Sequence, residues 1–419
     1  MPNPELVAQG KQFEKQVVKL ADGLWTAVGF AASNVHMIEG QSSVTIIDTT
    51  ETTKAAENIL AAFREITDKP IARIILTHSH RDHISGATVF SKGKDIPVIA
   101  SHLFSSDLVG VDQDRIAPNK ALMRRTMMQF GIGLAPDQRI SLGVGPGDRP
   151  MEGMGAGFID PTERIPDDCE IDLDGVRAQL IHAPGETHDH IIVWLPEQKA
   201  VFSADNWYHA FPNLYAIRGT PYRDYQAWVD TLDMLSKLGA VVLAPGHTMP
   251  LMGNKTITEA LTTTRDAILY VMQATTDGMN QGKSMDDICA EMALPADLAD
   301  KPWLKEFYGK LTWSARAFAA GTLGWYDGNP THLGTLSGKT RAEHIAKLAG
   351  GADKMHDAAK ATDDLQWRLE LCDHLLALGE PVGELKAQTM EALAETEINA
   401  TARNSYFSAA KQLRELKDQ

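Results

Sequence analysis

The chemically most reactive stretch of the chain is HSHRDH at residues 78–83, which directly follows the apolar run IARIILT. This run predicts a buried strand. Two histidines one residue apart at its end, His78 and His80, can converge on one metal ion, while Asp82 and His83 can face a second ion as the chain turns into a helix. Imidazole and carboxylate together suit zinc, and also manganese or iron. A His-rich polar loop is the alternative, but four ligand-type residues in six positions after a buried strand argue against it.

The elements around this motif must carry it and bring distant ligands to it. Short apolar runs separated by turns predict antiparallel strands within 22–49, and helical spacing predicts a helix at 53–67. A strand at 96–101 and a helix at 113–130 follow. Residues 131–166 are rich in Gly and Pro and too long for an ordinary connection. We expect this segment to form a cover over the site, with an irregular excursion as the alternative.

A second strand-rich block, which contains one helix at 224–237, ends near residue 254. Its predicted strands lie at 175–185, 190–196, 200–205 and 240–247. From residue 255 onward Ala, Leu, Lys and Glu dominate, and this composition predicts helices. They are expected at 255–280, 284–293, 302–320, 340–349, 353–360, 363–378, 381–394 and 398–417. The sequence therefore predicts two domains, a mixed α and β domain at 1–254 and an all-helical domain at 255–419.

The HxHxDH motif resembles that of the metallo-β-lactamase superfamily, which implies an α+β fold, an αββα sandwich, with two metal ions per chain. Further superfamily motifs occur in the expected order: TIIDTT, APGET, SADN and APGH. The resemblance implies one ion on His78, His80 and Glu186, a second ion on Asp82, His83 and His247, and Asp205 as the bridging ligand. Two Zn²⁺ ions are expected, with other divalent transition metals possible. Two adjacent cations activate a shared water, so Asp82 and Asp205 are also expected to act in catalysis.

Two further roles follow from this resemblance. Asp48, in TIIDTT, is implied to brace the metal loop through hydrogen bonds, and an ordinary carboxylate at a strand end is the alternative. Glu186 stands where most members have His, which makes its neighbours His182, His188 and His190 rivals for the site. Of these, His188 is the one we expect to support the metal ligands.

Three features resemble one branch of the superfamily, the alkylsulfatases. They are Glu186, the stretch NLYAIRG at 213–219 and the stretch LGWYDGNP at 323–330. In that family the first stretch supplies an Asn and an Arg that hold the sulfate ester, here Asn213 and Arg218, and the second lies in a helical dimerisation domain. The resemblance therefore implies hydrolysis of an alkyl sulfate to an alcohol and inorganic sulfate by a homodimer. A guanidinium fork suits two sulfate oxygens.

The chain departs from the family pattern at several positions. The bridging residue is Asp205 rather than Glu, a family His that helps to hold sulfate falls at Trp313, and a family Tyr falls at Phe130. These changes predict a more apolar pocket and an alcohol part other than a plain detergent chain. Typical members also carry a C-terminal lipid-carrier-like domain, and the expectation here is a chain that lacks it.

Composition narrows the range of partners. The net charge is −15, which disfavours nucleic acid and requires local positive charge for an anionic substrate. The three cysteines, Cys169, Cys289 and Cys372, form no CxxC pair and are expected to be small buried side chains. No signal peptide or membrane span is expected, so a soluble cytoplasmic protein is predicted.

Other functions remain open on the residues alone. The fold also carries thioesterases, lactonases and phosphoester hydrolases, and the metal motif does not separate them from a sulfatase. Di-iron oxygen or nitric oxide reductases share the fold but usually have Glu where this chain has His80, and they need a flavin domain. A non-catalytic metal-binding protein would be expected to have lost ligands, whereas the full set is present here.

Overall fold

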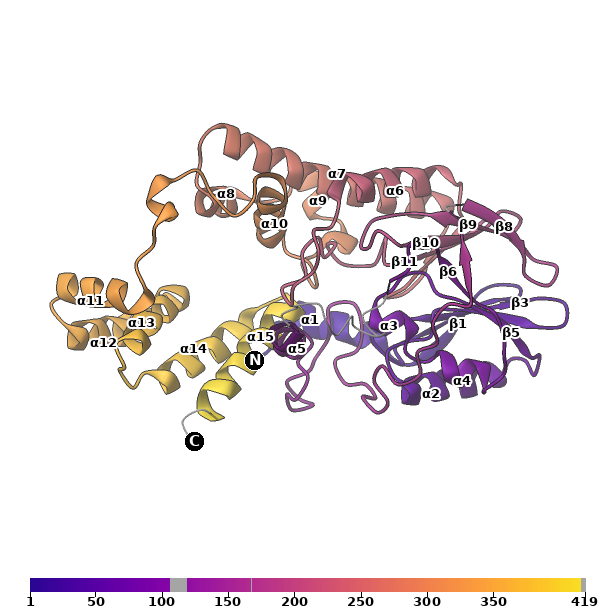
Figure 1. Cartoon of the computed structure of the whole chain (residues 1–419), viewed down its shortest axis with the longest axis horizontal. Helices are drawn as coiled ribbons and strands as arrows, with labels where there is room; N and C mark the ends of the chain where they lie inside the picture. The colour runs from indigo at the N-terminus through magenta and orange to yellow at the C-terminus, as the bar shows by residue number, and fades with distance from the viewer. Residues whose placement is uncertain (106–118, 167, 416–419) are drawn as a thin grey trace.

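Two β-sheets face each other in the computed structural model, which describes residues 1–105, 119–166 and 168–415 (Figure 1). The first sheet has the order β1-β2-β3-β4-β5-β6-β7. Its strands are β1 Gln16–Ala21, β2 Leu24–Val28, β3 Val35–Glu39, β4 Val44–Ile47, β5 Ile71–Ile75, β6 Val98–Ser101 and β7 Glu163–Ile165. The second sheet has the order β13-β12-β11-β10-β9-β8. Its strands are β8 Asp168–Asp172, β9 Arg177–His182, β10 Ile191–Leu195, β11 Ala200–Ala204, β12 Val242–Pro245 and β13 Leu251–Met252.

Apolar side chains fill the space between the two sheets. Strands β3, β4, β10 and β11 are buried along almost their whole length, which matches their continuous runs of Val, Ile and Ala. The central core includes Ile38, Ile47, Ile75, Val193 and Phe202. Strands β1 to β4 pair antiparallel, whereas β4 to β7 pair parallel, so the carboxyl ends of β4 and β5 lie at one edge.

Helices cover both outer faces. Helix α2 (Thr53–Arg64), which the Thr52 side chain caps, and α4 (Ala87–Ser91) pack on the first sheet through a second apolar cluster. Helices α6 (Tyr225–Lys237) and α7 (Asn254–Asn280) pack on the second sheet through a third cluster (Figure 1). The predicted αββα sandwich is therefore confirmed.

The remaining helices form an extension at one end of the sandwich (Figure 1). They are α8 Met285–Glu291, α9 Ala296–Ala299, α10 Leu311–Leu323, α11 Gly338–Ala349, α12 Ala352–Ala361, α13 Leu365–Ala377, α14 Gly383–Thr396 and α15 Ala400–Glu415. Helices α11 to α13 share a small core of their own around Leu371 and Leu375. The last helix, α15, returns to the sandwich and packs beside α5 (Asn119–Gln129), close to the N-terminal helix α1 (Pro4–Gly10) (Figure 1).

Most elements follow the sequence-based expectation, and the exceptions have physical reasons. The helix expected at 302–320 was wrong in its first half: residues 305–310 are irregular, and a regular helix begins only at Leu311. This turn is held by other segments, because Phe307 accepts a hydrogen bond from the Ala400 N–H and Gly309 donates one to Phe211. Part of the helix expected at 113–130 lies outside the described residues. Within the parts of the chain that are described, no helix is long and apolar enough to cross a membrane.

The boundary between the two domains falls near the start of α7. This helix begins at Asn254, one residue from the predicted division, yet it packs along α6 as part of the outer layer of the sandwich. The division into 1–254 and 255–419 therefore stays a proposal.

Candidate metal centre

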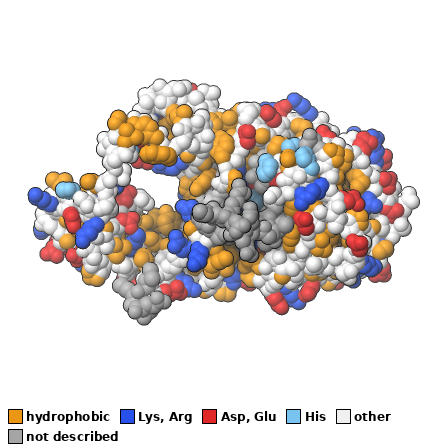
Figure 2. Space-filling model, in the orientation of Figure 1, with side chains coloured by type: hydrophobic (Ala, Val, Ile, Leu, Met, Phe, Trp, Pro, Cys, Tyr) orange, Lys and Arg blue, Asp and Glu red, His pale blue; other side chains and the backbone are white. Residues whose placement is uncertain are grey.

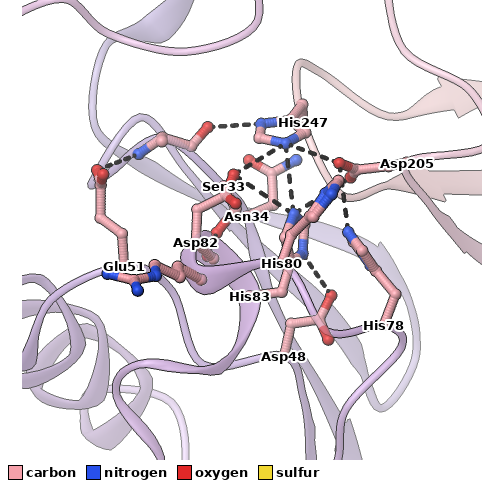
Figure 3. A network of polar contacts seen from close by, with 12 residues as sticks. Ser33, Asn34, Asp48, Glu51, His78, His80, Asp82, His83, Asp205 and His247 are labelled. Atoms are coloured by element: carbon pink, nitrogen blue, oxygen red, sulfur yellow. Dashed lines mark hydrogen bonds and ion pairs between the residues drawn. The ribbon is translucent and has the colours of Figure 1, made fainter. Parts of the chain in front are cut away.

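The residues expected to bind metal lie at one edge of the sandwich, where strands from both sheets end. His78 comes three residues after β5, and the next turn of chain forms the short helix α3 (Arg81–Ile84), which carries Asp82 and His83. Asp205 directly follows β11, and His247 comes two residues after β12. Because β5, β11 and β12 all end at this edge, side chains up to 169 positions apart in the sequence meet here (Figure 3).

The side chains form two groups whose ligand atoms lie within 4.8 Å of one another. The first group is His78, His80 and Asp205, and the second is Asp82, His83 and His247. Asp205 lies between them: its Oδ2 is 3.6 Å from His78 Nε2 and 3.2 Å from His247 Nε2. Its Oδ1 is 3.3 Å from His83 Nε2. The structure thus brings six of the seven expected ligands into two adjacent clusters.

The seventh expected ligand, Glu186, lies beside the first group. Its Oε1 is 3.6 Å from His80 Nδ1 and 2.9 Å from an Nη of Arg223, a buried arginine. Its Oε2 is buried and has no hydrogen-bond partner among the described residues. Burial raises the pKa of Glu186 to about 7, although Arg223 works against this rise.

Hydrogen bonds on the far side of each imidazole fix its orientation. His83 Nδ1 lies 2.8 Å from Asp48 Oδ2, and the same carboxylate accepts hydrogen bonds from the N–H and hydroxyl of Thr77. His247 Nδ1 lies 2.7 Å from the Ala32 carbonyl, and His78 Nδ1 lies 3.0 Å from Thr77 Oγ1. Since each Nδ1 faces an acceptor, each Nε2 is left with its lone pair toward the cluster.

The backbone is strained where it delivers these side chains. Asp48, Ala204 and Thr248 have positive φ values of 58°, 42° and 68°. Such conformations are costly for residues with a Cβ and tend to cluster at functional sites. Gly246 allows a close approach: a Cβ on it would lie 2.4 Å from Asp205 Oδ1. The chain therefore accepts unfavourable local geometry to hold the two groups together.

Without a cation, the imidazoles and carboxylates of the cluster neutralise each other. Burial lowers the pKa of His247, but Asp205 and Asp82 outweigh it and raise this pKa to about 10. Burial raises the pKa of Asp205, but His247, His83 and His78 hold it well below the usual value. The carboxylates around His83 and His247 thus favour positive charge at this position.

The donor set fits divalent cations. His78 Nε2, Asp205 Oδ1 and Glu186 Oε2 are buried without a hydrogen-bond partner in the part of the chain that is described. Such unpaired polar atoms are costly unless something binds them. Neutral imidazole and carboxylate oxygen are ligands that divalent transition metals accept.

The two residues expected to bind substrate lie next to this cluster. Asn213 is buried, its backbone N–H donates to Tyr208 Oη at 2.8 Å, and its side-chain Nδ2 has no partner among the described residues. Arg223 donates to the Asn213 carbonyl. The half-buried Arg218 lies within electrostatic reach of His80: burial first, and then Arg218, lowers the pKa of that imidazole. Positive charge from Arg218 and Arg223 thus adjoins the first metal group.

Comparison with known proteins supplies the family. The metallo-β-lactamase superfamily model matches residues 28–247, and the alkyl sulfatase dimerisation model matches residues 284–416. A linear primary-alkylsulfatase from Pseudomonas sp. is 32% identical over 90% of this chain and 73% of its own length. The chain belongs to the alkylsulfatases of the metallo-β-lactamase superfamily. This family consists of sulfuric ester hydrolases, and its fold and donor groups support binding of divalent metal ions.

Other relatives agree with this membership. The alkyl/aryl-sulfatase of Saccharomyces cerevisiae is 31% identical over 95% of this chain and 64% of its own length. The solved structure of a stereoselective inverting sec-alkylsulfatase from Pseudomonas sp. superposes with a TM-score of 0.85 at 26% identity, over 99% of this chain and 69% of that one. The chain spans 61–73% of the length of the four alkylsulfatases that it matches.

One expected residue of this alkylsulfatase site needs correction. His188 was expected to support the metal ligands, but its side chain is exposed. His190 is buried in its place: its ring stacks on His78 with centroids 4.8 Å apart, and its Nε2 accepts a hydrogen bond from the Asp205 N–H at 3.2 Å. Burial lowers the pKa of His190 to about 3, so the ring is neutral. His190 directly precedes β10, a strand in which every residue is buried, whereas His188 lies on the loop before it.

Several residues around the site were missed from the sequence. Arg223, Tyr208 and Tyr308 are buried beside Glu186 and Asn213, and burial raises the pKa of both phenols. Tyr308 lies on the irregular turn that had been expected to be helical, and its carbonyl is held by Asn399 of the helical extension. Nothing in the stretch PYRDY distinguishes Arg223 in the sequence, because its ion pair with Glu186 forms only in the folded chain.

Proposed function

We propose that this chain hydrolyses an alkyl sulfate monoester to an alcohol and inorganic sulfate. The observation that carries the proposal is the position of Arg218 and the unpartnered Asn213 amide beside the metal ligands. The related linear primary-alkylsulfatases, similar over most of the chain, support the same substrate class. Since the protein carries a net charge of −15, attraction of a sulfate ester requires local positive charge of this kind.

In this proposal the cofactor is a pair of Zn²⁺ ions. His78, His80 and Glu186 would hold one ion, Asp82, His83 and His247 would hold the other, and Asp205, which lies between the two groups, would be available to both. The abundance of imidazole suits zinc, which binds such ligands in catalytic sites. When bound, the two cations supply an activated water and positive charge close to the ester.

The protein's own groups bind and orient the ester. The Arg218 guanidinium pairs with two sulfate oxygens, and the free Asn213 Nδ2 donates to a third. Arg223 does not share this role, because Glu186 and the Asn213 carbonyl already engage it. It keeps Glu186 ionised and turned toward His80. Trp313, whose ring lies 5.6 Å from Lys310 Nζ, is proposed to make the alcohol side more apolar.

We propose that the carbon–oxygen bond breaks. Water attacks carbon, the new bond forms to the water oxygen, and the bonding electron pair leaves with sulfate. Asp82, the carboxylate of the second group, has a side chain that is 31% exposed and accepts the proton of the water. Sulfate is a weak base and needs no proton to leave. His209, whose N–H donates to the Thr248 hydroxyl beside His247, is a poor proton donor, because burial lowers its pKa to about 4. The relative that is a stereoselective inverting sec-alkylsulfatase supports this proposal, because inversion at a carbon centre requires its carbon–oxygen bond to break.

The test is a substrate panel with the zinc-loaded protein: a primary alkyl sulfate, the matching phosphate, a thioester and a lactone. The proposal expects sulfate release to dominate, and His80→Ala to lose the ion of the first group together with activity. Preference for another ester class would contradict it. Hydrolysis in ¹⁸O water tests the bond that breaks, since label in the alcohol supports attack at carbon and label in sulfate contradicts it.

We further propose that the chain is a homodimer. The dimerisation model covers helices α8 to α15. Large apolar side chains are exposed after α10, among them Leu323, Trp325, Leu333 and Leu336. Figure 2 shows hydrophobic side chains gathered on the part of the extension that carries α8 to α10, and an open gap between that part and helices α11 to α13. Light scattering is expected to give twice the chain mass, and a monomer would contradict the proposal.

A further inference from the structure

The connection between β2 and β3 lies against both loops that carry the second metal group. Ser33 Oγ donates to the Asp82 carbonyl. Asn34 Nδ2 donates to the carbonyls of Pro245 and Thr248, at 3.0 and 2.8 Å, on either side of His247. Figure 3 shows Ser33 and Asn34 next to Asp82 and His247. This connection therefore helps to set the distance between the two ligand loops.

Ala32 is the residue of this connection that contacts a ligand side chain. Its carbonyl accepts the hydrogen bond from His247 Nδ1 at 2.7 Å, and its own N–H donates to Glu51 Oε1 at 2.9 Å (Figure 3). The position of Glu51 thus sets the position of Ala32, and Ala32 sets the orientation of the His247 ring. This link could not be predicted from the sequence, because Ala32 acts through its backbone alone.

Glu51 is held in turn by Arg149 from the Gly- and Pro-rich segment 131–166. Arg149 Nε donates to the same Glu51 Oε1 at 2.6 Å, and both side chains are buried. A buried ion pair is rarely the most stable solution for a core, since apolar residues of the same volume often do as well. A charged acceptor does give shorter and more directional hydrogen bonds, which is useful where a ligand must be oriented.

A second contact joins segment 131–166 to Ala32 independently. A Cβ placed on Gly145 would lie 2.5 Å from the Ala32 carbonyl oxygen, the atom that His247 uses. Ala32 is therefore fixed by Glu51 at its N–H and by the backbone at Gly145 near its carbonyl. Segment 131–166 was expected to cover the site, but these contacts show it supporting the site from beside the ligand loops.

We infer that Arg149 and Glu51 are positioning residues for His247, acting through Ala32. The inference rests on the proposed function, because His247 matters as a ligand of the second cation. Arg149 and Glu51 lie 98 positions apart in the sequence, and neither belongs to the metal ligands or to the proposed substrate clamp. The inference explains why they form a buried ion pair at this place. Removing partners outside the ligand shell typically weakens metal binding by about 10–100-fold.

The experiment measures zinc affinity in metal-free protein with a competing chromophoric chelator. In a His80→Ala background the remaining ion binds at Asp82, His83 and His247. There the double change Glu51→Met with Arg149→Met, which removes both charges and the acceptor for Ala32, is expected to raise the Kd by about 10–100-fold. Glu51→Gln keeps an acceptor oxygen and is expected to cause a much smaller rise.

Two controls separate positioning from a general loss of structure. In a His247→Ala background the remaining ion binds at the first group, and the double change is expected to leave its Kd unchanged. Asp148→Asn alters a neighbouring residue whose side chain is 73% exposed and is expected to change neither Kd. Equal effects of the double change on both sites, or on neither, would overturn the positioning role. A wild-type chain that binds no divalent cation would instead refute the proposed function, and the positioning role with it.

Discussion

Replacement of Arg223 by Met is expected to destabilise the metal-free protein strongly. Its guanidinium is buried, with 2% of the side chain exposed, and lies 2.9 Å from the Glu186 carboxylate, which is as deeply buried. Met fills a similar volume but leaves the carboxylate without its partner. Breaking a buried ion pair in this way costs about 3–5 kcal/mol, because a buried charge is left uncompensated.

The loss is also expected to depend on pH. Burial already raises the pKa of Glu186 to about 7, and Arg223 limits that rise, so its removal raises this pKa further. Between the unfolded pKa and the folded pKa the folded state binds more protons, and the free energy of unfolding therefore falls as pH rises. The variant is expected to lose more stability at pH 9 than at pH 6, by up to about 1.4 kcal/mol per pH unit while Glu186 titrates.

Urea denaturation of the metal-free protein at pH 6, 7.5 and 9 provides the measurement. Arg265→Met is the matched control, because Arg265 pairs with Asp233 at 2.7 Å on the outer helices and is 25% exposed. Such a partly exposed pair contributes about 0–1 kcal/mol. Equal losses in the two variants, or a loss from Arg223→Met that stays constant with pH, would refute the reasoning.

Two further predictions concern the substrate clamp and the metal-free site. Gln129 Oε1 accepts a hydrogen bond from the Arg218 N–H at 2.9 Å. Gln129→Ala is therefore expected to lower kcat/KM for an alkyl sulfate, through an activation free energy that rises by about 1–3 kcal/mol. Arg124→Ala, on the exposed face of α5, is expected to have no effect. Unchanged steady-state kinetics in both variants would contradict this. The raised pKa of His247, about 10, means that its stabilising contribution is full below pH 6.5 and is lost as pH rises to 10. Urea denaturation is expected to show a fall of several kcal/mol over this range in metal-free protein and a smaller fall in zinc-loaded protein; a flat profile without metal would contradict it.

The ligand set was accessible from the sequence because its chemistry is local. Four ligand-type residues stand together in HSHRDH, and the other ligands each follow a short buried strand. The resemblance of these motifs to those of the metallo-β-lactamase superfamily implied that they form the two groups. The structure places Asp48 against Thr77 and His83, where the superfamily motif led us to expect it.

The supporting contacts were not accessible, because they depend on long-range packing. Arg149 and Glu51 are ordinary charged residues in the sequence, and only the folded chain brings them together around Ala32. Strand β8 was missed because its sequence, DCEID, alternates charged and half-buried residues at a sheet edge. The turn that carries Tyr308 has apolar residues at helical spacing, but hydrogen bonds from Asn399 hold it in another conformation.

The most direct test of the account compares two substrates of the zinc-loaded protein before and after Arg218→Ala. The substrates are a primary alkyl sulfate and a neutral ester with the same alkyl chain, and Arg124→Ala serves as the control. Loss of a charged partner to a bound anion costs about 2–5 kcal/mol. The account predicts that kcat/KM falls by about 30-fold or more for the sulfate and little for the neutral ester. Equal losses on both substrates would contradict it, because Arg218 would then support the fold rather than recognise sulfate.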